Sequence, residues 1–367
     1  MVGATMTGHG RIVFANQLRG IAAISVVITH FCFTYWRQNA NISPFFGANP
    51  TDPGQLISSQ VFTHFYPGVF GVALFFLISG FVIPFSVSSL SRSRFLTARA
   101  VRIYPTYWAC FAYTLAAAYI SATYWGNDLN YTSQTIIKNI LLIHTIDGTY
   151  SLDLVNWTLA IEIKFYIIFA LFHRAITSGT SIRVLLISAA ALLAANILKG
   201  PIGNELTLIS FMLIGTLFYL GIAGRITNTE VLISSITLIS AVIYFWNITP
   251  WPDSRYPIAA NYAAALIVFS ACYFLRHKFR ESKTIDFFAS ISYPLYLVHA
   301  IPGYAIITIL LRNGCGKWMA VISATAISIA VAYAIHKLVE IPTNAYCKKL
   351  IVKGRRKSTN MQHERNC

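Results

Sequence analysis

Charged residues are scarce in this 367-residue chain, because Asp, Glu, Lys and Arg together make up only 11% of it. Ordinary soluble domains contain about 25% charged residues. Hydrophobic residues make up 56% of the chain, which leaves too little polar surface to cover a soluble globule of this size. The composition excludes a disordered chain and an ordinary soluble enzyme, and it indicates an integral membrane protein.

Acidic residues are the rarer charge: 12 Asp and Glu stand against 28 Lys and Arg, so the formal net charge is +16. A basic excess is typical of nucleic-acid-binding proteins and also of membrane proteins with basic cytoplasmic loops. The basic residues of this chain are spread over several loops and a tail instead of forming one patch. We therefore expect no nucleic-acid partner.

Closely spaced cysteines are also missing. None of the six cysteines forms a CxxC pair, and Cys32, Cys110 and Cys272 lie in apolar runs, where cysteine usually serves as packing material. We expect neither a disulfide framework nor a metal site. The N-terminal residues have no apolar core followed by a cleavage signal, so the first apolar run is expected to be a retained span.

Long hydrophobic runs, by contrast, are frequent. A transmembrane helix needs about 20 mostly apolar residues. Ten segments qualify, bounded approximately by residues 19–37, 67–87, 102–128, 154–172, 183–199, 205–225, 230–253, 255–276, 286–312 and 317–339. The segment 135–145 is short and carries Lys138, so we expect a surface element there, although an eleventh span would change the count. The predicted fold is an all-α bundle of about ten transmembrane helices.

The basic residues also predict the orientation of the bundle. With the N-terminus in the cytoplasm, 21 of the 28 Lys and Arg residues fall in cytoplasmic segments and six fall outside. This asymmetry follows the positive-inside rule and predicts that both termini are cytoplasmic. The expected organisation is an N-terminal segment (1–16), a transmembrane domain (17–342) and a basic tail (343–367), whose KKLIVKGRRK run would bind anionic lipid.

Ionisable residues inside spans are costly in lipid and are therefore functional candidates. Arg19 and His30 lie eleven residues apart in the first span, almost three helical turns, so both project from one face about 16 Å apart along the axis. Imidazole is a natural general base near neutral pH. Taken alone, the pair fits a structural role, with an anchoring arginine and a helix-packing histidine, as well as it fits a catalytic one.

Two further arginines follow the second span. Arg99 and Arg102 are three residues apart, which puts them on adjacent turns of one helix face. Paired guanidinium groups suit phosphate and pyrophosphate, although a positive-inside loop would have the same residues.

Glu162 lies within the fourth span, about 12 Å from its outer end, and His30 lies about 9 Å from the same side. The two side chains could share a depth, where the carboxylate would orient the imidazole. Glu162 could instead pair with another helix. Lys164 projects from nearly the opposite face and is expected to snorkel or pair separately. In the ninth span, Ser292, Tyr296 and His299 form a polar stripe that fits a structural role or a pore lining equally.

Six segments carry a more specific pattern. They are LRGIAAISVVITHF, VALFFLISGFVI, RAVRIYPTYW, NWTLAIEIKFY, ISYPLYLVHA and HKLVEIP, and they occur in this order between about residues 16 and 342. Each segment is weak evidence alone, but together they are specific. In this respect the chain resembles the acyltransferase-3 family of bacterial membrane O-acyltransferases.

The resemblance implies a ten-helix bundle in the bacterial inner membrane. It implies that an acyl group, expected to be acetyl, passes from cytosolic acyl-CoA (acetyl-CoA) to a hydroxyl of a cell-surface or lipid-linked carbohydrate. By the resemblance, His30 would be catalytic, with Glu162 on the motif glutamate, and Arg19, Arg99 and Arg102 would bind the donor. The candidate substrate or pore residues are His299, Tyr296, Ser292 and Trp157. The partners expected are acyl-CoA, the carbohydrate acceptor and membrane lipid.

The chain departs from the family pattern at two points. Thr158 and Ala160 replace residues common in the motif around Glu162, and no SGNH-type soluble domain follows the last span, which suggests a stand-alone enzyme. The alternative function is a secondary transporter or exporter of a sugar or small metabolite, with buried His, Glu and Lys as proton-relay groups. The lack of an internal repeat and of interrupted helix pairs weighs against it. The acceptor, the acyl length and a direct or acyl-histidine route stay open.

Overall fold

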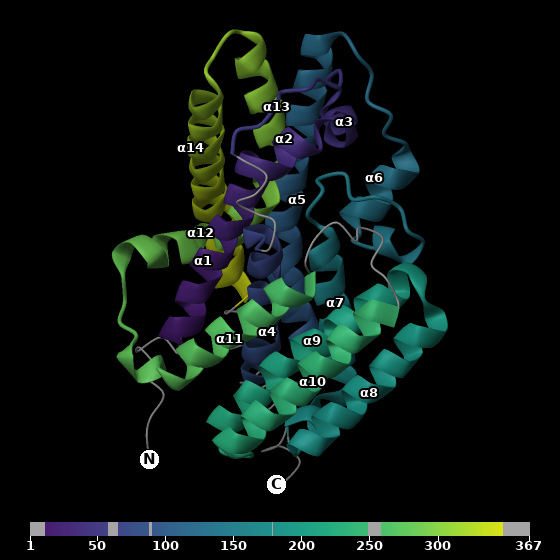
Figure 1. Ribbon diagram of the computed structural model, residues 1–367, viewed down its shortest axis with the longest axis vertical. Coiled ribbons are helices and arrows are strands. Elements are labelled where there is room, and N and C mark those ends of the chain that lie inside the picture. The colour runs from purple at the N-terminus through teal and green to yellow at the C-terminus, as the bar shows by residue number, and fades with distance from the viewer. Residues whose placement is uncertain (1–11, 58–64, 88–89, 178, 249–257, 348–367) are drawn as a thin grey trace, which may run out of the picture.

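The computed structural model describes residues 12–57, 65–87, 90–177, 179–248 and 258–347, and their regular structure is helical. The main helices are α1 (Val13–Thr29), α2 (Tyr35–Arg37), α3 (Asn39–Ile42), α4 (Pro67–Val87), α5 (Arg92–Trp125), α6 (Ser133–Ile140), α7 (Trp157–Thr177), α8 (Ser181–Leu198), α9 (Gly200–Ile222), α10 (Asn228–Ile248), α11 (Ile258–Phe274), α12 (Lys283–Val298), α13 (Ala300–Arg312) and α14 (Lys317–Ile335). Figure 1 shows α5, α13 and α14 along the long axis of the molecule and α8, α9 and α10 running obliquely at the other end.

Within the described residues, six helices are long and apolar enough to cross a membrane. They are the continuous helix from Val13 to Arg37, α4, α8, α9, α10 and the helix from Lys317 to Cys347. The bent pair of α12 and α13 makes a seventh candidate, and α11 is apolar but shorter. The remaining two predicted spans correspond to α5 and α7, so all ten predicted segments contain helix, while the number of crossings stays a prediction.

The predicted boundaries differ from those of the helices. The first helix begins at Val13, before the predicted start at residue 17, and the last continues to Cys347, beyond residue 342. The segment 135–145 forms the end of α6, a short turn and the start of a 3₁₀ turn, as expected of a short element. The KKLIVKGRRK run lies outside the described residues. Arg19 of α1 and Asn344 of the last helix line one cavity, so these two parts of the chain lie at the same end of the bundle.

Helices α4 and α9 approach each other so closely that their backbones touch. A Cβ atom added at Gly80 would lie 1.8 Å from the Met212 carbonyl oxygen, and one at Gly215 would lie 2.2 Å from the Leu77 oxygen. Small residues let helices pack at this distance, and packing is the main attraction between helices in lipid. The Thr216 hydroxyl also donates a hydrogen bond of 3.0 Å to the Gly80 carbonyl. The pair therefore forms a rigid centre for the bundle.

Replacing Gly80 by alanine is expected to destabilise the protein by about 1–3 kcal/mol, the usual cost of overpacking a core. The reason is that the methyl group meets backbone, which cannot move away as a flexible side chain can. Thermal unfolding of the purified protein in detergent measures the effect. Gly316→Ala is the matched control, since no atom lies within 4 Å of its added Cβ. Equal melting temperatures for the two variants would contradict the close contact.

The ninth predicted span is broken, contrary to the expectation that the chain has no interrupted helix. Helices α12 and α13 meet at His299 and are bent by 72°. Pro302 explains the break, because it has no N–H to donate to the carbonyl of Val298 and its ring would clash with that group in a continuous helix. Proline is instead well accommodated in the first turn of the new helix, α13. This is one bent pair among the described residues, not the two matched breaks typical of transporters.

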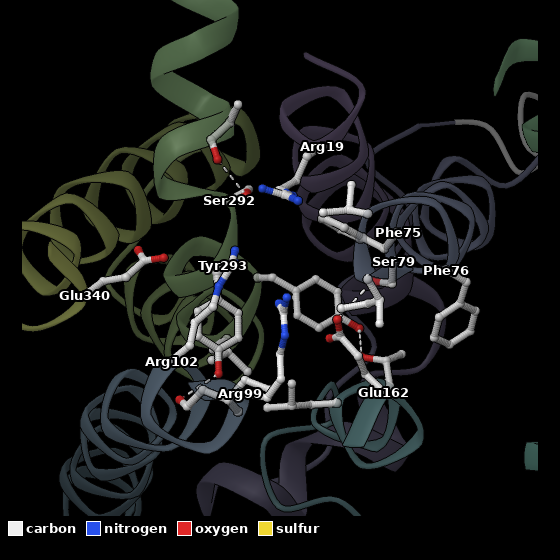
Figure 2. A pocket seen from close by; sticks show the side chains of 18 of the residues that line it. Arg19, Phe75, Phe76, Ser79, Arg99, Arg102, Glu162, Ser292, Tyr293 and Glu340 are labelled. Carbon is white, nitrogen blue, oxygen red and sulfur yellow. Dashed lines mark hydrogen bonds between the residues drawn. The ribbon is translucent and has the colours of Figure 1, made fainter. Parts of the chain in front are cut away.

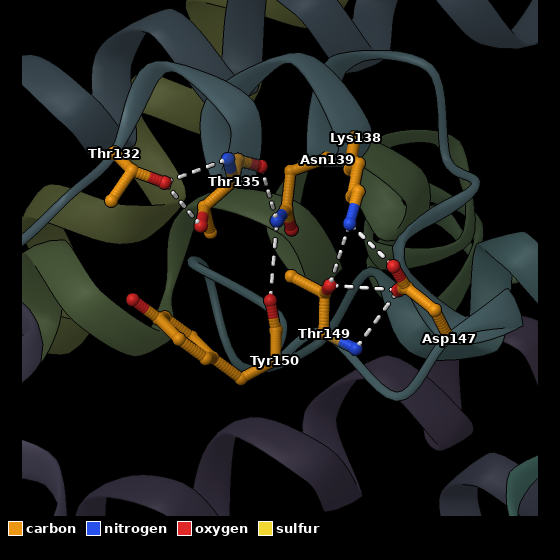
Figure 3. Close-up of polar contacts among 7 residues, drawn as sticks. All are labelled: Thr132, Thr135, Lys138, Asn139, Asp147, Thr149 and Tyr150. Atoms are coloured by element: carbon orange, nitrogen blue, oxygen red, sulfur yellow. Dashed lines mark hydrogen bonds and ion pairs between the residues drawn. The ribbon is translucent and has the colours of Figure 1, made fainter.

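A group of hydrogen-bonded side chains lies in the segment before α7 (Figure 3). The Asn139 side chain donates to the Thr135 and Tyr150 carbonyls at 3.0 and 3.1 Å and accepts from the Leu152 backbone N–H at 3.1 Å. Nearby, Lys138 and Thr149 bind the Asp147 carboxylate and lower its pKa to about 2. These contacts hold the loop that leads into α7, the helix that carries Trp157, Thr158 and Glu162.

Candidate functional site

A cavity of about 220 Å³ lies between α1, α4, α5, α7, α12 and the last helix. We call it the arginine cavity, because Arg19, Arg99 and Arg102 all line it. Its other polar lining residues are Ser79, Thr158, Glu162, Tyr166, Ser290, Ser292, Tyr293, Tyr296, His336, Glu340 and Asn344. Figure 2 shows the three guanidinium groups, which come from two helices, directed toward a common space. The structure thus brings together the three predicted donor-binding residues.

Arg99 is the most constrained of the three arginines. Its side chain is buried, and its guanidinium carbon lies 5.4 Å from the centre of the Phe95 ring and 5.5 Å from that of the Tyr166 ring. A cation over an aromatic ring is stabilised by the ring quadrupole, more so where water is excluded. The two rings therefore hold the charge of Arg99 in a fixed place.

Glu162 also belongs to the arginine cavity. Its Oε1 accepts a hydrogen bond of 2.9 Å from the Ser79 hydroxyl and another from the Tyr166 hydroxyl. Among the described residues it makes no hydrogen bond to His30, which lines a different cavity. The expected orienting contact between Glu162 and His30 is therefore wrong, because similar depth along two helices does not make their side chains face each other. Lys164 pairs separately, as expected, with Glu205 at 2.5 Å.

A second cavity, of about 340 Å³, contains His30 in its wall, and we call it the histidine cavity. Its lining is rich in aromatic rings and uncharged polar groups: Thr29, Thr34, Gln38, Tyr66, Trp157, Trp246, Tyr262, Tyr296 and Tyr304. Trp157, a predicted substrate residue, is on the wall of this cavity. Arg19 and His30, although on one continuous helix, serve different cavities.

His30 begins a π-helical segment, His30–Thr34, inserted in the first helix. Such segments are rare and often occur at functional sites. The His30 ring stacks on Tyr304 with a centroid distance of 6.0 Å and lies 4.8 Å from the ring of His299. His299 is fully buried and lines neither cavity, so the structure does not support the predicted pore-lining role for it.

Tyr296 stands between the two cavities. It and Val72 line both of them. The Tyr296 hydroxyl is 2.9 Å from the Thr158 hydroxyl and 3.3 Å from the Val155 carbonyl oxygen, to which it donates. Ser292, one turn earlier on α12, lines only the arginine cavity and donates to the Ala289 carbonyl. The polar stripe of the ninth span thus runs from one cavity to the wall of the other.

Several lining residues that were not predicted had a recognisable signal in the sequence. Tyr166 lies four residues after Glu162 and therefore on the same helix face. His336 and Glu340 belong to the HKLVEIP segment and form a pair at 2.6 Å within a second π-helical segment. Ser79 had no such signal, because its partner lies on another helix.

No group of three or more His, Cys, Asp or Glu side chains in the described ranges could hold a metal ion. The arginine cavity carries three guanidinium groups against the two carboxylates of Glu162 and Glu340, and the histidine cavity presents hydroxyl, amide, imidazole and aromatic groups. The arginine cavity therefore suits a phosphate-bearing ligand better than a cation.

Comparison with known proteins agrees with this architecture. The acyltransferase domain family matches residues 12–337, nearly the whole chain. This range contains the lining of the histidine cavity and that of the arginine cavity except for Glu340 and Asn344. No curated protein and no solved structure shows a significant match. The match covers most of the helical bundle and leads to one conclusion: the chain belongs to the acyltransferase-3 family of membrane acyltransferases.

Proposed function

We propose that this protein is an O-acyltransferase of the bacterial inner membrane. It transfers an acyl group, expected to be acetyl, from acyl-CoA to a hydroxyl of a cell-surface or lipid-linked carbohydrate. The observation that carries the proposal is the pair of chemically different cavities that share the wall of Tyr296 and Val72. One is suited to an anionic donor and the other to a neutral, hydroxyl-bearing acceptor.

The arginine cavity is the proposed donor site. Coenzyme A carries phosphate and pyrophosphate groups, and guanidinium binds such groups with paired, charge-assisted hydrogen bonds. Arg99 lies against the rings of Phe95 and Tyr166, so little side-chain freedom is lost when an anion binds. The predicted orientation puts this end of the bundle in the cytoplasm, where acyl-CoA is found.

The histidine cavity is the proposed acceptor site. Trp157, Trp246 and the tyrosines offer flat apolar faces for the C–H surfaces of a sugar ring, while Gln38 and the threonine hydroxyls can bind its hydroxyl groups. A mostly apolar pocket with a few polar groups is the usual form of a small-molecule site. None of the described lining residues is an Asp, Glu, Lys or Arg, which favours a neutral portion of a glycan over an anionic one.

His30 is the proposed general base. It removes the proton from the acceptor hydroxyl as the hydroxyl oxygen bonds to the carbonyl carbon of the thioester. The carbon–sulfur bond breaks, and the imidazolium gives the proton to the departing sulfur. The products are an ester and the free thiol of CoA, and His30 returns to its neutral form.

Purified protein in lipid nanodiscs is expected to release free CoA thiol only when acyl-CoA and a suitable glycan are both present. Thiol release is followed with a thiol reagent, and mass spectrometry of the glycan detects the added acyl group. A panel of lipid-linked and surface glycans identifies the acceptor. Transport of a sugar into proteoliposomes without consumption of acyl-CoA would contradict the proposal and favour the transporter alternative.

A further inference from the structure

The imidazole of His299 is a buried, ionisable group to which the proposed function gives no role. It lies at the break between α12 and α13 and is completely buried. Its Nδ1 is 3.0 Å from the Leu295 carbonyl oxygen. A carbonyl oxygen can only accept, so Nδ1 carries the proton of the neutral ring. Nε2 is then an unprotonated acceptor, and it is buried with no hydrogen-bond partner among the described residues.

The neighbouring ring has a complementary nitrogen. Nδ1 of His30 is also buried without a hydrogen-bond partner in the described structure. The centroids of the two rings are 4.8 Å apart, with an angle of 53° between their planes. Buried polar groups without partners are costly, so two of them on adjacent rings point to a hydrogen bond formed by a small rotation.

The described rings that contact this pair are uncharged. Tyr304 from α13 stacks on His30, while Phe31 and Tyr296 have ring centroids 6.0 and 6.1 Å from that of His299. Glu162 is bound by Ser79 and Tyr166 in the arginine cavity. The usual carboxylate partner of a catalytic histidine is thus replaced at this place by a second imidazole.

We propose that His299 is the positioning residue for His30 and selects its tautomer. His30 donates its Nδ1 proton to Nε2 of His299, which leaves Nε2 of His30 unprotonated and able to act as the base toward the histidine cavity. The inference rests on the proposed role of His30. When His30 takes up the hydroxyl proton, its Nδ1–H bond to His299 becomes charge-assisted and stronger. A neutral partner does this without placing a permanent charge in the membrane.

Two substitutions separate this role from a structural one. His299→Leu removes the acceptor, whereas His299→Gln keeps a carbonyl acceptor of similar reach. The leucine variant is expected to lose about 10–100-fold in kcat, the usual effect of removing an orienting partner, with acyl-CoA affinity unchanged. The glutamine variant should recover most of the rate.

Nitrogen NMR of the full chain, labelled at histidine, reads the tautomer directly. The His30 signal, assigned by its absence in His30→Ala, should show the Nδ1–H form in the wild type and in His299→Gln, and the Nε2–H form in His299→Leu. If the leucine variant does not fold, His299→Asn takes its place, because its shorter side chain cannot reach His30. His144→Gln is the control, since His144 is also fully buried but binds Ser151 outside both cavities.

The outcomes distinguish this inference from the function on which it rests. An unchanged rate and tautomer in His299→Leu, with His30→Ala inactive, would overturn the role of His299 and leave the proposed function intact. Full activity of His30→Ala would instead overturn the catalytic role of His30. The tautomer inversion together with rescue by glutamine supports the proposal.

Discussion

Replacement of His30 by alanine is expected to lower the rate of acyl transfer by about 10²–10⁴-fold, the usual contribution of a positioned general base. The hydroxyl group of an acceptor is a poor nucleophile at neutral pH, so transfer depends on removal of its proton as the new bond forms. Binding of acyl-CoA should be unaffected, because His30 lines the histidine cavity and not the arginine cavity. Single-turnover transfer to the glycan, alongside donor binding, measures both quantities.

Cys32→Ala is the matched control for this variant. Cys32 lies two residues away in the same π-helical segment but lines neither cavity, so its removal tests whether the segment tolerates loss of a side chain. Its activity should stay close to that of the wild type. A well-folded His30→Ala protein with wild-type turnover would show that the base is another group, and His336, paired with Glu340 in the arginine cavity, would be the next to replace.

The arginine cavity was largely predictable from the sequence. Arg99 and Arg102 are three residues apart on one helix, so their common face follows from helical geometry alone. Arg19 joins them in the cavity, which agrees with the predicted gathering of basic residues at one side of the membrane. The ten apolar runs were likewise readable, since lipid demands a minimum length and composition from any span.

The environment of His30 was not predictable, for two physical reasons. Depth in the membrane says nothing about the rotation of a helix about its axis, so Glu162 could match the depth of His30 and still face Ser79 and Tyr166. The π-helical segment and the break at His299 also depart from the 3.6-residue period on which the face assignments depend. His299 lies beside His30 at the point where the helix bends, and the spacing of apolar residues does not reveal this bend.

The second large effect is expected when the arginines are replaced, and it concerns binding of the acyl-CoA donor and not catalysis. Replacing Arg99 or Arg102 by alanine should remove at least one charge-assisted contact to the donor, at a cost of about 1.5–3 kcal/mol. This corresponds to a rise of roughly 10–150-fold in the dissociation constant for acyl-CoA. Isothermal titration of the purified protein with a non-hydrolysable acyl-CoA analogue measures it. Arg92→Ala is the control, because Arg92 begins the same helix but does not line the cavity.

Lysine at the same positions separates geometry from charge. Arg102→Lys keeps the positive charge but cannot form two parallel hydrogen bonds to one phosphate, so its affinity should fall between those of the wild type and the alanine variant. Arg99→Lys should be weakened further, because a compact, strongly hydrated ammonium replaces the planar group that lies against Phe95 and Tyr166. If both alanine variants bind the analogue as tightly as Arg92→Ala, the arginines serve only to orient the protein in the membrane. An affinity for the analogue that falls from arginine to lysine to alanine, and not only when the charge is removed, would identify the arginine cavity as the donor site.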